Sequence, residues 1–274
     1  MERTIVMKKK LAAGIVMAAV MAAAGICTAW AADQFTVGFD AEYPPYGYMD
    51  SETGEYTGFD LELAQAVADM EGWELVKKPI DWDSKDMELN SGSIDCIWNG
   101  FTLDGREDDY TWSVPYVDNS QVIVVKESSG IDSLEGLAGK IVGVQAASAA
   151  LTLLEEEEGQ KELADTFADL QQFPDYNTGF TELDAGAIDA LAIDVGVAAY
   201  QIKNREGFVI LDEELNSEQY AVGFKLGNEE LRDTVEADLL ALVEDGTFMA
   251  LAEKYELQDM VCLGVEAAEE ETDA

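Results

Sequence analysis

Acidic and aromatic side chains crowd the segment GFDAEYPPYGYMD at residues 38–50. Asp40 and Glu42 supply carboxylates, three tyrosines supply ring faces, and the double proline restricts the backbone between them. Carboxylates attract cationic or hydrogen-bond-donating groups, and aromatic faces cover them. A core element needs no such loop after a strand, so this segment is a candidate for contact with a small molecule.

Other kinds of chemistry are excluded by what the chain lacks. It contains no histidine, which rules out serine–histidine triads, histidine-ligated zinc and imidazole acid–base catalysis. Cys96 and Cys262, the cysteines that follow residue 31, do not have the spacing of a metal site. They could form a disulfide in an exported protein, but the sequence alone does not bring them together.

The first 31 residues have the layout of a secretory signal. Basic residues lie within positions 1–10, an apolar run covers Leu11–Ile26, and Ala29-Trp30-Ala31 is a small-x-small cleavage site. We therefore expect residues 1–31 to be a signal peptide and the mature chain to be periplasmic or extracellular. Lipidation at Cys27 is the less favoured alternative, because Ile26 stands where a lipobox requires a small residue.

The mature chain is strongly acidic. Cleavage after Ala31 leaves 12 basic and 56 acidic residues, a balance that repels nucleic acid and anionic membrane surfaces. The tail EAAEEETDA at 266–274 is expected to be a solvated, disordered end. Solubility is the ordinary explanation for most of this charge.

One pattern occurs twice, as ELNSGSIDCIWNG at 88–100 and ELDAGAIDALAID at 182–194. Each copy is typical of a helix end, a glycine turn and a short buried strand. The strands QFTVGF (34–39) and KIVGVQ (140–145) precede them, each followed by a polar loop and an amphipathic helix. Strands that alternate with helices predict an α/β fold with a mainly parallel sheet in each of two lobes.

The lobes are expected to enclose a cleft. Residues 32–121 begin lobe 1, 122–218 form lobe 2, and 219–265 return to lobe 1. The β-rich stretches SQVIVVK (120–126) and EQYAVGFK (218–225) are the expected hinge strands. Ligands of open α/β sheets bind beyond the carboxyl ends of the strands. The loops at 40–48, 98–106, 145–149 and 194–196 are therefore expected to line a cleft that closes on a small molecule.

Motifs along the mature chain resemble the family 3 extracellular solute-binding proteins, the polar amino acid receptors of ABC importers. They are, in order, GFDLELAQAVA, GSIDCIWNGFTLDGRE, SVPYV, LAGKIVGVQAAS, AGAIDALAID and DGTFMALAEKY, together with YPPYGY. The last position of the first signature falls at Glu71, where the family has an apolar or small residue. The resemblance implies a type II periplasmic-binding-protein-like fold, a free amino acid ligand, delivery to a membrane ABC permease, a monomer, and no cofactor or metal.

The resemblance also implies a set of ligand-binding residues. Arg106 matches the clamp on the ligand α-carboxylate, Ser148 matches the helix-opening hydroxyl that faces it, and Asp194 matches the ammonium-binding aspartate. Arg106 follows Thr102 by one residue fewer than is usual in the family. As ordinary alternatives, Arg106 offsets the acids around it, and Ser148 and Asp194 cap helices.

Other positions complete the expected site. Gly100 and Thr102 match residues that offer a carbonyl and a hydroxyl, and Tyr43 matches the aromatic residue that stacks over the ligand. Gln145 matches a position that varies with the ligand side chain, Trp82 closes the far wall or belongs to the core, and Asp40 meets a polar or cationic group. Phe101 and Ala149 belong to the same loops and complete the set. Asp40, Glu42 and Asp83 slightly favour a polar or cationic amino acid.

Two other functions have the same fold class. A cyclohexadienyl dehydratase-like enzyme would need a carboxylic acid with a raised pKa, for which Glu42 or Asp83 could be proposed. A ligand-sensing subunit that signals to a separate receptor is the second alternative. The binding function is favoured, and we expect no enzymatic activity.

Overall fold

The computed structural model describes residues 33–203 and 205–265. The expected signal peptide, Cys27 and the acidic tail lie outside the described residues. Within the described ranges, no helix has both the length and the apolar character needed to cross a bilayer.

Lobe 1 is built on a five-stranded sheet. Its strands, in spatial order, are β5 (Glu74–Pro79), β1 (Gln34–Phe39), β6 (Cys96–Ile97), β14 (Gly223–Lys225) and β7 (Tyr110–Trp112). Strands β5, β1 and β6 are parallel, whereas β14, which the chain forms after it has completed the lobe 2 sheet, pairs antiparallel with β6 and β7. A small sheet of β2 (Glu42–Tyr43), β3 (Gly47–Met49) and β4 (Tyr56–Thr57) follows β1.

Lobe 2 is built on a six-stranded sheet. Its strands are β10 (Asp169–Phe173), β9 (Ile141–Gln145), β11 (Ala190–Asp194), β8 (Val117–Lys126) and β12 (Phe208–Ile210), with β13 (Asn216–Tyr220) also on β8. Strands β10, β9 and β11 are parallel, and the pairs made by β8 are antiparallel. The predicted parallel strands are thus present in both lobes, with antiparallel strands added beside them.

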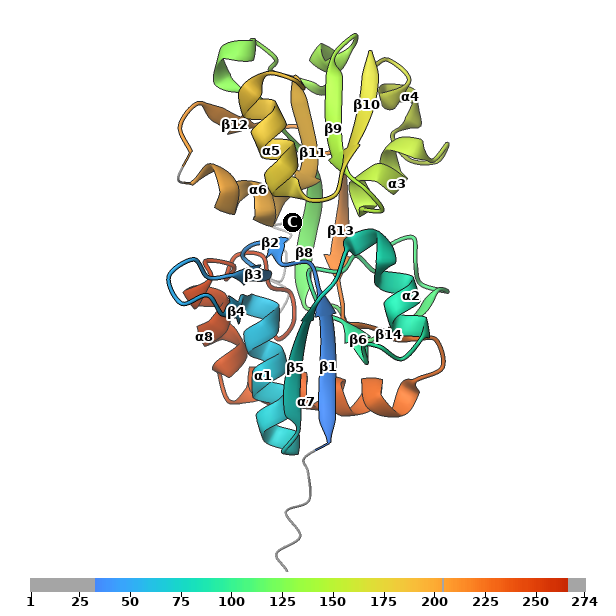
Figure 1. Ribbon diagram of the computed structural model, residues 1–274, viewed down its shortest axis with the longest axis vertical. Helices are drawn as coiled ribbons and strands as arrows, with labels where there is room; N and C mark the ends of the chain where they lie inside the picture. The colour runs from blue at the N-terminus through green and yellow to red at the C-terminus, as the bar shows by residue number, and fades with distance from the viewer. Residues whose placement is uncertain (1–32, 204, 266–274) are drawn as a thin grey trace, which may run out of the picture. The chain divides into compact units, whose positions relative to one another are not determined.

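Strands β8 and β13 connect the two lobes. The first half of β8 pairs with β13, and its second half pairs with β11 and β12. Both strands run between the two groups of elements (Figure 1). The predicted hinge stretches 120–126 and 218–225 therefore fall on β8 and on the segment from β13 to β14.

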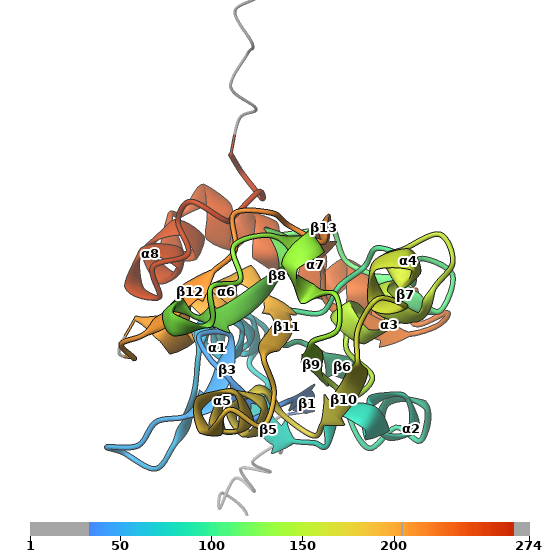
Figure 2. The ribbon, with the colours of Figure 1, turned by 90° about the horizontal axis from the view of Figure 1, so that it is seen from above.

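Helices cover both faces of the sheets. They are α1 (Phe59–Glu71), α2 (Lys85–Asn90), α3 (Ala149–Glu155), α4 (Lys161–Ala164), α5 (Tyr176–Ala185), α6 (Val195–Ile202), α7 (Glu229–Glu244) and α8 (Thr247–Lys254), with 3-10 turns at Trp82–Ser84 (η1), Glu127–Ser129 (η2) and Leu134–Leu137 (η3). Alternate residues of β11 point to opposite faces, so Leu191 and Ile193 join one apolar cluster and Ala190 and Ala192 another. Figure 2 shows α5 and α3 on the two sides of β9 that these clusters fill.

The two amphipathic helices expected from the sequence are both present in the structure. Helix α1 ends at Gly72 in the left-handed conformation, and its predicted inner residues Leu61, Ala64, Val67 and Ala68 are buried. The second amphipathic helix is shorter than the pattern SAALTLLEEEEG suggests, because α3 ends at Glu155 and the next three glutamates follow it.

The repeated sequence pattern corresponds to a repeated packing arrangement. A Cβ atom on Gly38 of β1 would lie 2.4 Å from Ile94, and one on Gly143 of β9 would lie 2.5 Å from Ile188. Glycine in the first strand and isoleucine in the repeat are therefore complementary shapes in both lobes.

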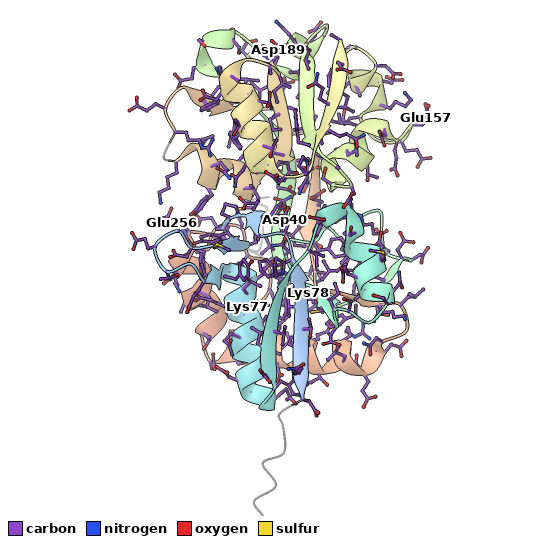
Figure 3. All side chains as sticks on the ribbon, viewed as in Figure 1. Asp40, Lys77, Lys78, Glu157, Asp189 and Glu256 are labelled. Atoms are coloured by element: carbon purple, nitrogen blue, oxygen red, sulfur yellow. The ribbon has the colours of Figure 1, made fainter. Side chains whose placement is uncertain are left out.

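The aspartate of each repeat fixes the same strand pair. The side chain of Asp95 accepts a hydrogen bond from the Thr36 amide at 2.7 Å, and that of Asp189 accepts one from the Ile141 amide at 2.9 Å. These aspartates stand at the start of the strands, and Figure 3 shows Asp189 well away from Asp40, which follows β1. Their shared role is structural.

Candidate functional site

Asp194 lies at the carboxyl end of β11, in the N-cap position of α6, but its side chain makes no capping hydrogen bond. Its carboxylate accepts from the hydroxyls of Tyr176 and Tyr220 at 2.9 and 2.7 Å, and from the amides of Asn119 and Gln121 at 3.0 and 2.5 Å. Helix capping, the ordinary explanation for an aspartate here, therefore does not account for its orientation.

A second buried carboxylate, Glu218 on β13, lies beside Asp194. Asn119 and Gln121 also donate to Glu218, at 2.9 and 2.8 Å, so the same two amides bridge both carboxylates. Asp194 is 4% exposed and Glu218 is 3% exposed. Burial, followed by the negative charge of Asp194, raises the pKa of Glu218, because both effects oppose ionisation.

No cation of the described residues neutralises this acid pair, since neither carboxylate takes part in an ion pair there. The side-chain oxygens of Asn119 and Gln121 and the hydroxyl of Tyr46 are buried without a hydrogen-bond partner in the described structure. Buried charges require a counter-charge, and buried acceptors require donors. The arrangement suits a group that brings a positive charge together with several N–H donors.

Four buried tyrosines surround the acid pair: Tyr43, Tyr46, Tyr176 and Tyr220. The ring of Tyr43 lies 5.9 Å from that of Tyr176 and 5.7 Å from that of Tyr46. The Tyr43 and Tyr220 hydroxyls are 3.1 Å apart, and because Tyr220 donates to Asp194, Tyr43 donates to Tyr220. Burial raises the pKa of all four phenols well above its usual value, so they remain neutral donors.

Gly100 and Thr102 lie next to these rings. Gly100 has a φ of 55°, and a Cβ atom there would lie 2.9 Å from the rings of both Tyr43 and Tyr220. The Thr102 hydroxyl donates to Glu218 at 2.9 Å. The buried carboxylate of Asp60 holds this loop by accepting a hydrogen bond from the Gly100 backbone amide at 2.6 Å. Burial raises the pKa of Asp60 to about 7.

Arg106 lies over the ring of Phe101, with its guanidinium carbon 5.3 Å from the ring centroid. It makes no ion pair with any described carboxylate, so the alternative that it offsets the neighbouring acids finds no contact here. A turn at Gly105, where φ is 78°, closes the loop, and the Arg106 side chain donates to the Thr102 carbonyl at 3.3 Å. The guanidinium is therefore free to receive an anion.

The ring of Trp82 packs edge-on against that of Phe101, with the ring centroids 5.5 Å apart, and Trp82 belongs to an apolar cluster of lobe 1. One face of Trp82 therefore forms part of the hydrophobic core. Lys85, which the sequence analysis did not single out, lies 5.1 Å above the Trp82 ring and donates to the Ala147 carbonyl of lobe 2 at 3.2 Å. Burial, followed by the charge of Arg106, lowers the pKa of Lys85 to about 8.

The start of α3 presents Ser148 as its N-cap. The hydroxyl accepts from the Leu151 amide at 3.1 Å and donates to the Gln145 carbonyl at 2.8 Å, so the ordinary capping role is present. Ala147, which precedes it, has a φ of 55°, in the left-handed region. Ala149 is the first residue of the helix and is half-buried.

Asp40 and Gln145 follow the equivalent strands of the two lobes and meet across the cleft. The Gln145 amide donates to the Asp40 carboxylate at 2.7 Å, and Asp40 also accepts from the Glu42 amide at 2.8 Å. Burial raises the pKa of Asp40 to about 6. Asn177 of lobe 2 donates to Glu42 in the same region.

A cavity of about 380 Å³ opens beside Asp40 and Trp82. Its acidic lining residues are Asp40, Glu42, Asp81, Glu88 and Asp175, and no lysine or arginine lines it. Asp83, expected to contribute to an acidic surface here, is exposed and does not line the cavity. The cavity favours a positively charged or hydrogen-bond-donating group.

Another cavity, of about 600 Å³, lies between the β2–β4 region and helices α6 and α8. It contains none of the predicted ligand-binding residues. Three lysines line it, of which Lys203 and Lys254 are paired with glutamates and Lys77 donates to a backbone carbonyl. We do not place the site there.

Neither a metal cluster nor a disulfide is found in the described part of the chain. No group of three or more histidine, cysteine, aspartate or glutamate side chains is arranged to hold an ion. Cys96 is buried in β6, Cys262 is partly exposed, and both are free thiols. The possible disulfide between them is therefore absent from this structure.

The structure brings the predicted residues together in two neighbouring groups. One group is linked, directly or through Tyr220, Glu218, Asn119 and Gln121, by the contacts described above and contains Tyr43, Trp82, Gly100, Phe101, Thr102, Arg106 and Asp194. The other contains Asp40, Gln145 and Ser148, joined by the hydrogen bonds from Gln145 to Asp40 and from Ser148 to Gln145. Lys85 donates to the Ala147 carbonyl, next to Ser148, and Ala149 makes none of these contacts. Sequence reasoning missed Glu218, Tyr220, Tyr176, Asn119, Gln121 and Lys85. One signal was available, because Asn119 and Gln121 are alternate residues and so share one face of β8 with the apolar Val117, Ile123 and Val125.

The chain is similar to known proteins in both sequence and fold. The sequence profile of the bacterial extracellular solute-binding proteins, family 3, matches residues 35–258. The chain is 32% identical over 224 residues to the L-cystine-binding protein TcyJ of Escherichia coli K12, a match that covers 80% of this chain and 81% of the relative.

Two solved structures are similar over most of their length. A substrate binding protein of an ABC uptake transporter from Streptococcus pneumoniae, with bound histidine, gives a TM-score of 0.79 at 32% identity and covers 83% of this chain and 94% of that one. The ancestral amino acid-binding protein AncCDT-1, described as a precursor of cyclohexadienyl dehydratase, gives a TM-score of 0.73 at 30% identity and covers 81% and 95%.

Proposed function

The chain belongs to the bacterial extracellular solute-binding proteins of family 3, and from this premise we propose that it binds a free amino acid between its lobes and delivers it to an ABC permease. The observation that carries the proposal is the buried carboxylate of Asp194, which is held by four neutral donors and has no cation among the described residues. An α-ammonium group supplies both the missing charge and further N–H donors.

The two ends of an amino acid fit different parts of the site. Its ammonium group would contact Asp194, the Thr102 hydroxyl and the Gly100 carbonyl, beneath Tyr43. Its α-carboxylate would lie between Arg106 and the start of α3 at Ser148, because a guanidinium binds a carboxylate through paired hydrogen bonds. Gly100, Phe101 and Ala149 would supply close backbone and wall contacts.

The ligand side chain would extend toward the cavity beside Asp40, Trp82 and Gln145. Five acidic residues line that cavity without a basic one. We therefore propose a polar or cationic side chain. The TcyJ relative is named for L-cystine and the Streptococcus structure contains histidine, so ligands within the family differ.

The remaining expectations belong to the same proposal. We propose a monomer that is exported by a signal peptide at residues 1–31 and acts in the periplasm or outside the cell. We keep the proposed lobe boundaries, 32–121, 122–218 and 219–265. Strands β7 and β14 lie in the lobe 1 sheet, as these boundaries require, whereas β8 and β13 of the lobe 2 sheet cross the boundaries as hinge strands.

We propose binding rather than catalysis. The two acids considered for a dehydratase, Glu42 and Asp83, are exposed, whereas a general acid in such an enzyme is expected to be buried. The relative TcyJ is named as a binding protein. Recovery of unchanged ligand after incubation tests this point directly.

The first experiment is a calorimetric titration of the mature protein, unfolded and refolded to remove carried-over ligand, against the common amino acids. Tight binding of one or a few, recovered unchanged, would support the proposal. Binding of none would count against it, and conversion of the ligand would favour the enzyme.

Variants then test the assigned roles. Asp194→Asn and Arg106→Ala should each weaken binding by about 2–5 kcal/mol, because each removes the partner of a desolvated charge. The matched controls are Asp212→Asn and Arg205→Ala, which change exposed residues of lobe 2 and should leave affinity unchanged. Wild-type affinity in both test variants would refute the site.

A further inference from the structure

The hinge strand β13 places a second carboxylate, that of Glu218, beside Asp194. A single ammonium group needs only one carboxylate partner. Glu218 shares the amides of Asn119 and Gln121 with Asp194, as described above. Nothing in the proposed amino acid binding requires this second acid. The inference drawn from it rests on the proposed function and concerns the same site.

Glu218 determines which hydrogen bonds the Thr102 hydroxyl can form. A threonine hydroxyl has one proton to donate and lone pairs that accept. The Thr102 proton goes to Glu218 at 2.9 Å, and a backbone bridge between Thr102 and Tyr220 keeps this loop against β13. The Thr102 hydroxyl is therefore left as an acceptor, which suits an ammonium group, whose nitrogen only donates.

The groups that face the pair are neutral or acidic. From β8 the pair faces the neutral amides of Asn119 and Gln121, and from α5 and β13 it faces the phenols of Tyr176 and Tyr220. Tyr43 of β2 and Tyr46, on the loop that follows, contribute two more neutral phenols, and Asp60 lies behind Tyr46 as a further acid. No lysine or arginine of the described chain pairs with either carboxylate.

Two buried carboxylates that share their hydrogen-bond donors do not both ionise readily, and their protons belong to the pair. We propose that Glu218 is a positioning residue of the ammonium subsite: it fixes the Thr102 hydroxyl as an acceptor, and together with Asp194 it holds one proton that leaves for solvent when the ligand ammonium enters. Binding exchanges a proton for a cation, and the charge of the buried site is conserved.

Proton release on binding is measured by calorimetry in two buffers of different ionisation enthalpy, between about pH 5.5 and pH 8. The probes are L-arginine and L-glutamine, because neither side chain titrates in this range. Wild type should release close to one proton per bound ligand over part of the range, and its affinity should rise by about tenfold per pH unit there. Above about pH 7, where Asp40 is already ionised, Glu218→Gln should release none, and its affinity should be independent of pH.

Controls separate this proton from others. Glu214→Gln, an exposed change close by in the chain, should behave as wild type. Asp238→Asn, on α7 and outside the proposed binding site, should keep the proton release, although it removes another buried carboxyl of raised pKa. Equal proton release in wild type and in Glu218→Gln would assign the proton elsewhere and overturn the inference.

The outcomes also distinguish the two proposals. Binding of a probe by wild type without proton release would overturn the inference and leave the proposed function intact. Failure of both probes to bind would count against a polar or cationic amino acid ligand, and the inference would fall with it. Because wild type alone decides these outcomes, the test does not depend on folding of Glu218→Gln.

Discussion

The buried carboxyl of Asp60 should make the unliganded protein more stable in mild acid than at neutral pH. Asp60 is fully buried, and burial raises its pKa from 3.8 to about 7 although the Gly100 amide and the Tyr116 hydroxyl donate to it. The unfolded chain restores the ordinary pKa. Protonation therefore favours the folded state between these values, and the stabilisation is lost as pH rises through the folded-state pKa.

The size of the effect follows from the shift. A rise of roughly three pKa units corresponds to about 4 kcal/mol between the fully protonated and fully ionised limits. Because the unfolded carboxyl is already ionised at pH 5, about 3 kcal/mol of this is present there and almost none at pH 8. Asp40, with a pKa raised to about 6, should add about 1 kcal/mol in the same direction.

Urea unfolding of wild type, Asp60→Asn and Asp69→Asn at both pH values measures the effect. Asparagine keeps an acceptor for both donors but cannot ionise, so Asp60→Asn should lose the larger part of the pH dependence. Asp69→Asn removes a charge from the exposed side of the same helix and should retain the wild-type dependence. An Asp60→Asn protein with the full wild-type difference would refute the assignment.

Three further outcomes are expected. Ala147→Gly should stabilise the protein by about 1 kcal/mol in urea unfolding, since glycine accepts the left-handed backbone there without a side-chain clash. Thr152→Gly, in the middle of α3, should instead destabilise it. Destabilisation by Ala147→Gly would contradict the backbone assignment. Gly100→Ala should reduce amino acid affinity at least tenfold by calorimetry, because its Cβ would displace two tyrosine rings; unchanged affinity would show that the loop is not at the ligand. Thiol titration of the unfolded, unreduced mature protein should find two free thiols, from Cys96 and Cys262, and finding none would reveal a disulfide.

Much of the fold follows from local sequence. Strand and helix periodicity is set by which residues must be buried, so it identified β1, β9, α1 and the two repeated units without any tertiary information. The repeat also has a local cause, because a small glycine, a bulky isoleucine and an aspartate that bonds a strand amide are required at each copy.

The sequence could equally identify candidate residues that follow strands. The loops that begin at Asp40, Gln145 and Asp194 were found this way, because the carboxyl ends of parallel strands share one edge of a sheet. The roles of Gln145 and Asp194 came from the family resemblance. The orientation of their side chains did not follow from the pattern. Asp194 has the sequence context of a helix cap, and only the structure shows that its carboxylate turns to Tyr176 and Tyr220 instead.

Tertiary structure alone decided the composition of the buried acid pair. Glu218 lies 24 residues beyond Asp194 in a stretch whose composition indicated only a hinge strand, and the two amides that it shares with Asp194 come from the other hinge strand. Pairing of β8 with β13 sets this register, and long-range pairing is not encoded in any single window of sequence. The sequence by itself therefore determined the elements and the loops that carry the proposed ligand-binding residues. The contact between distant strands decided which charges are buried together, and that contact depends on the packing of the whole chain.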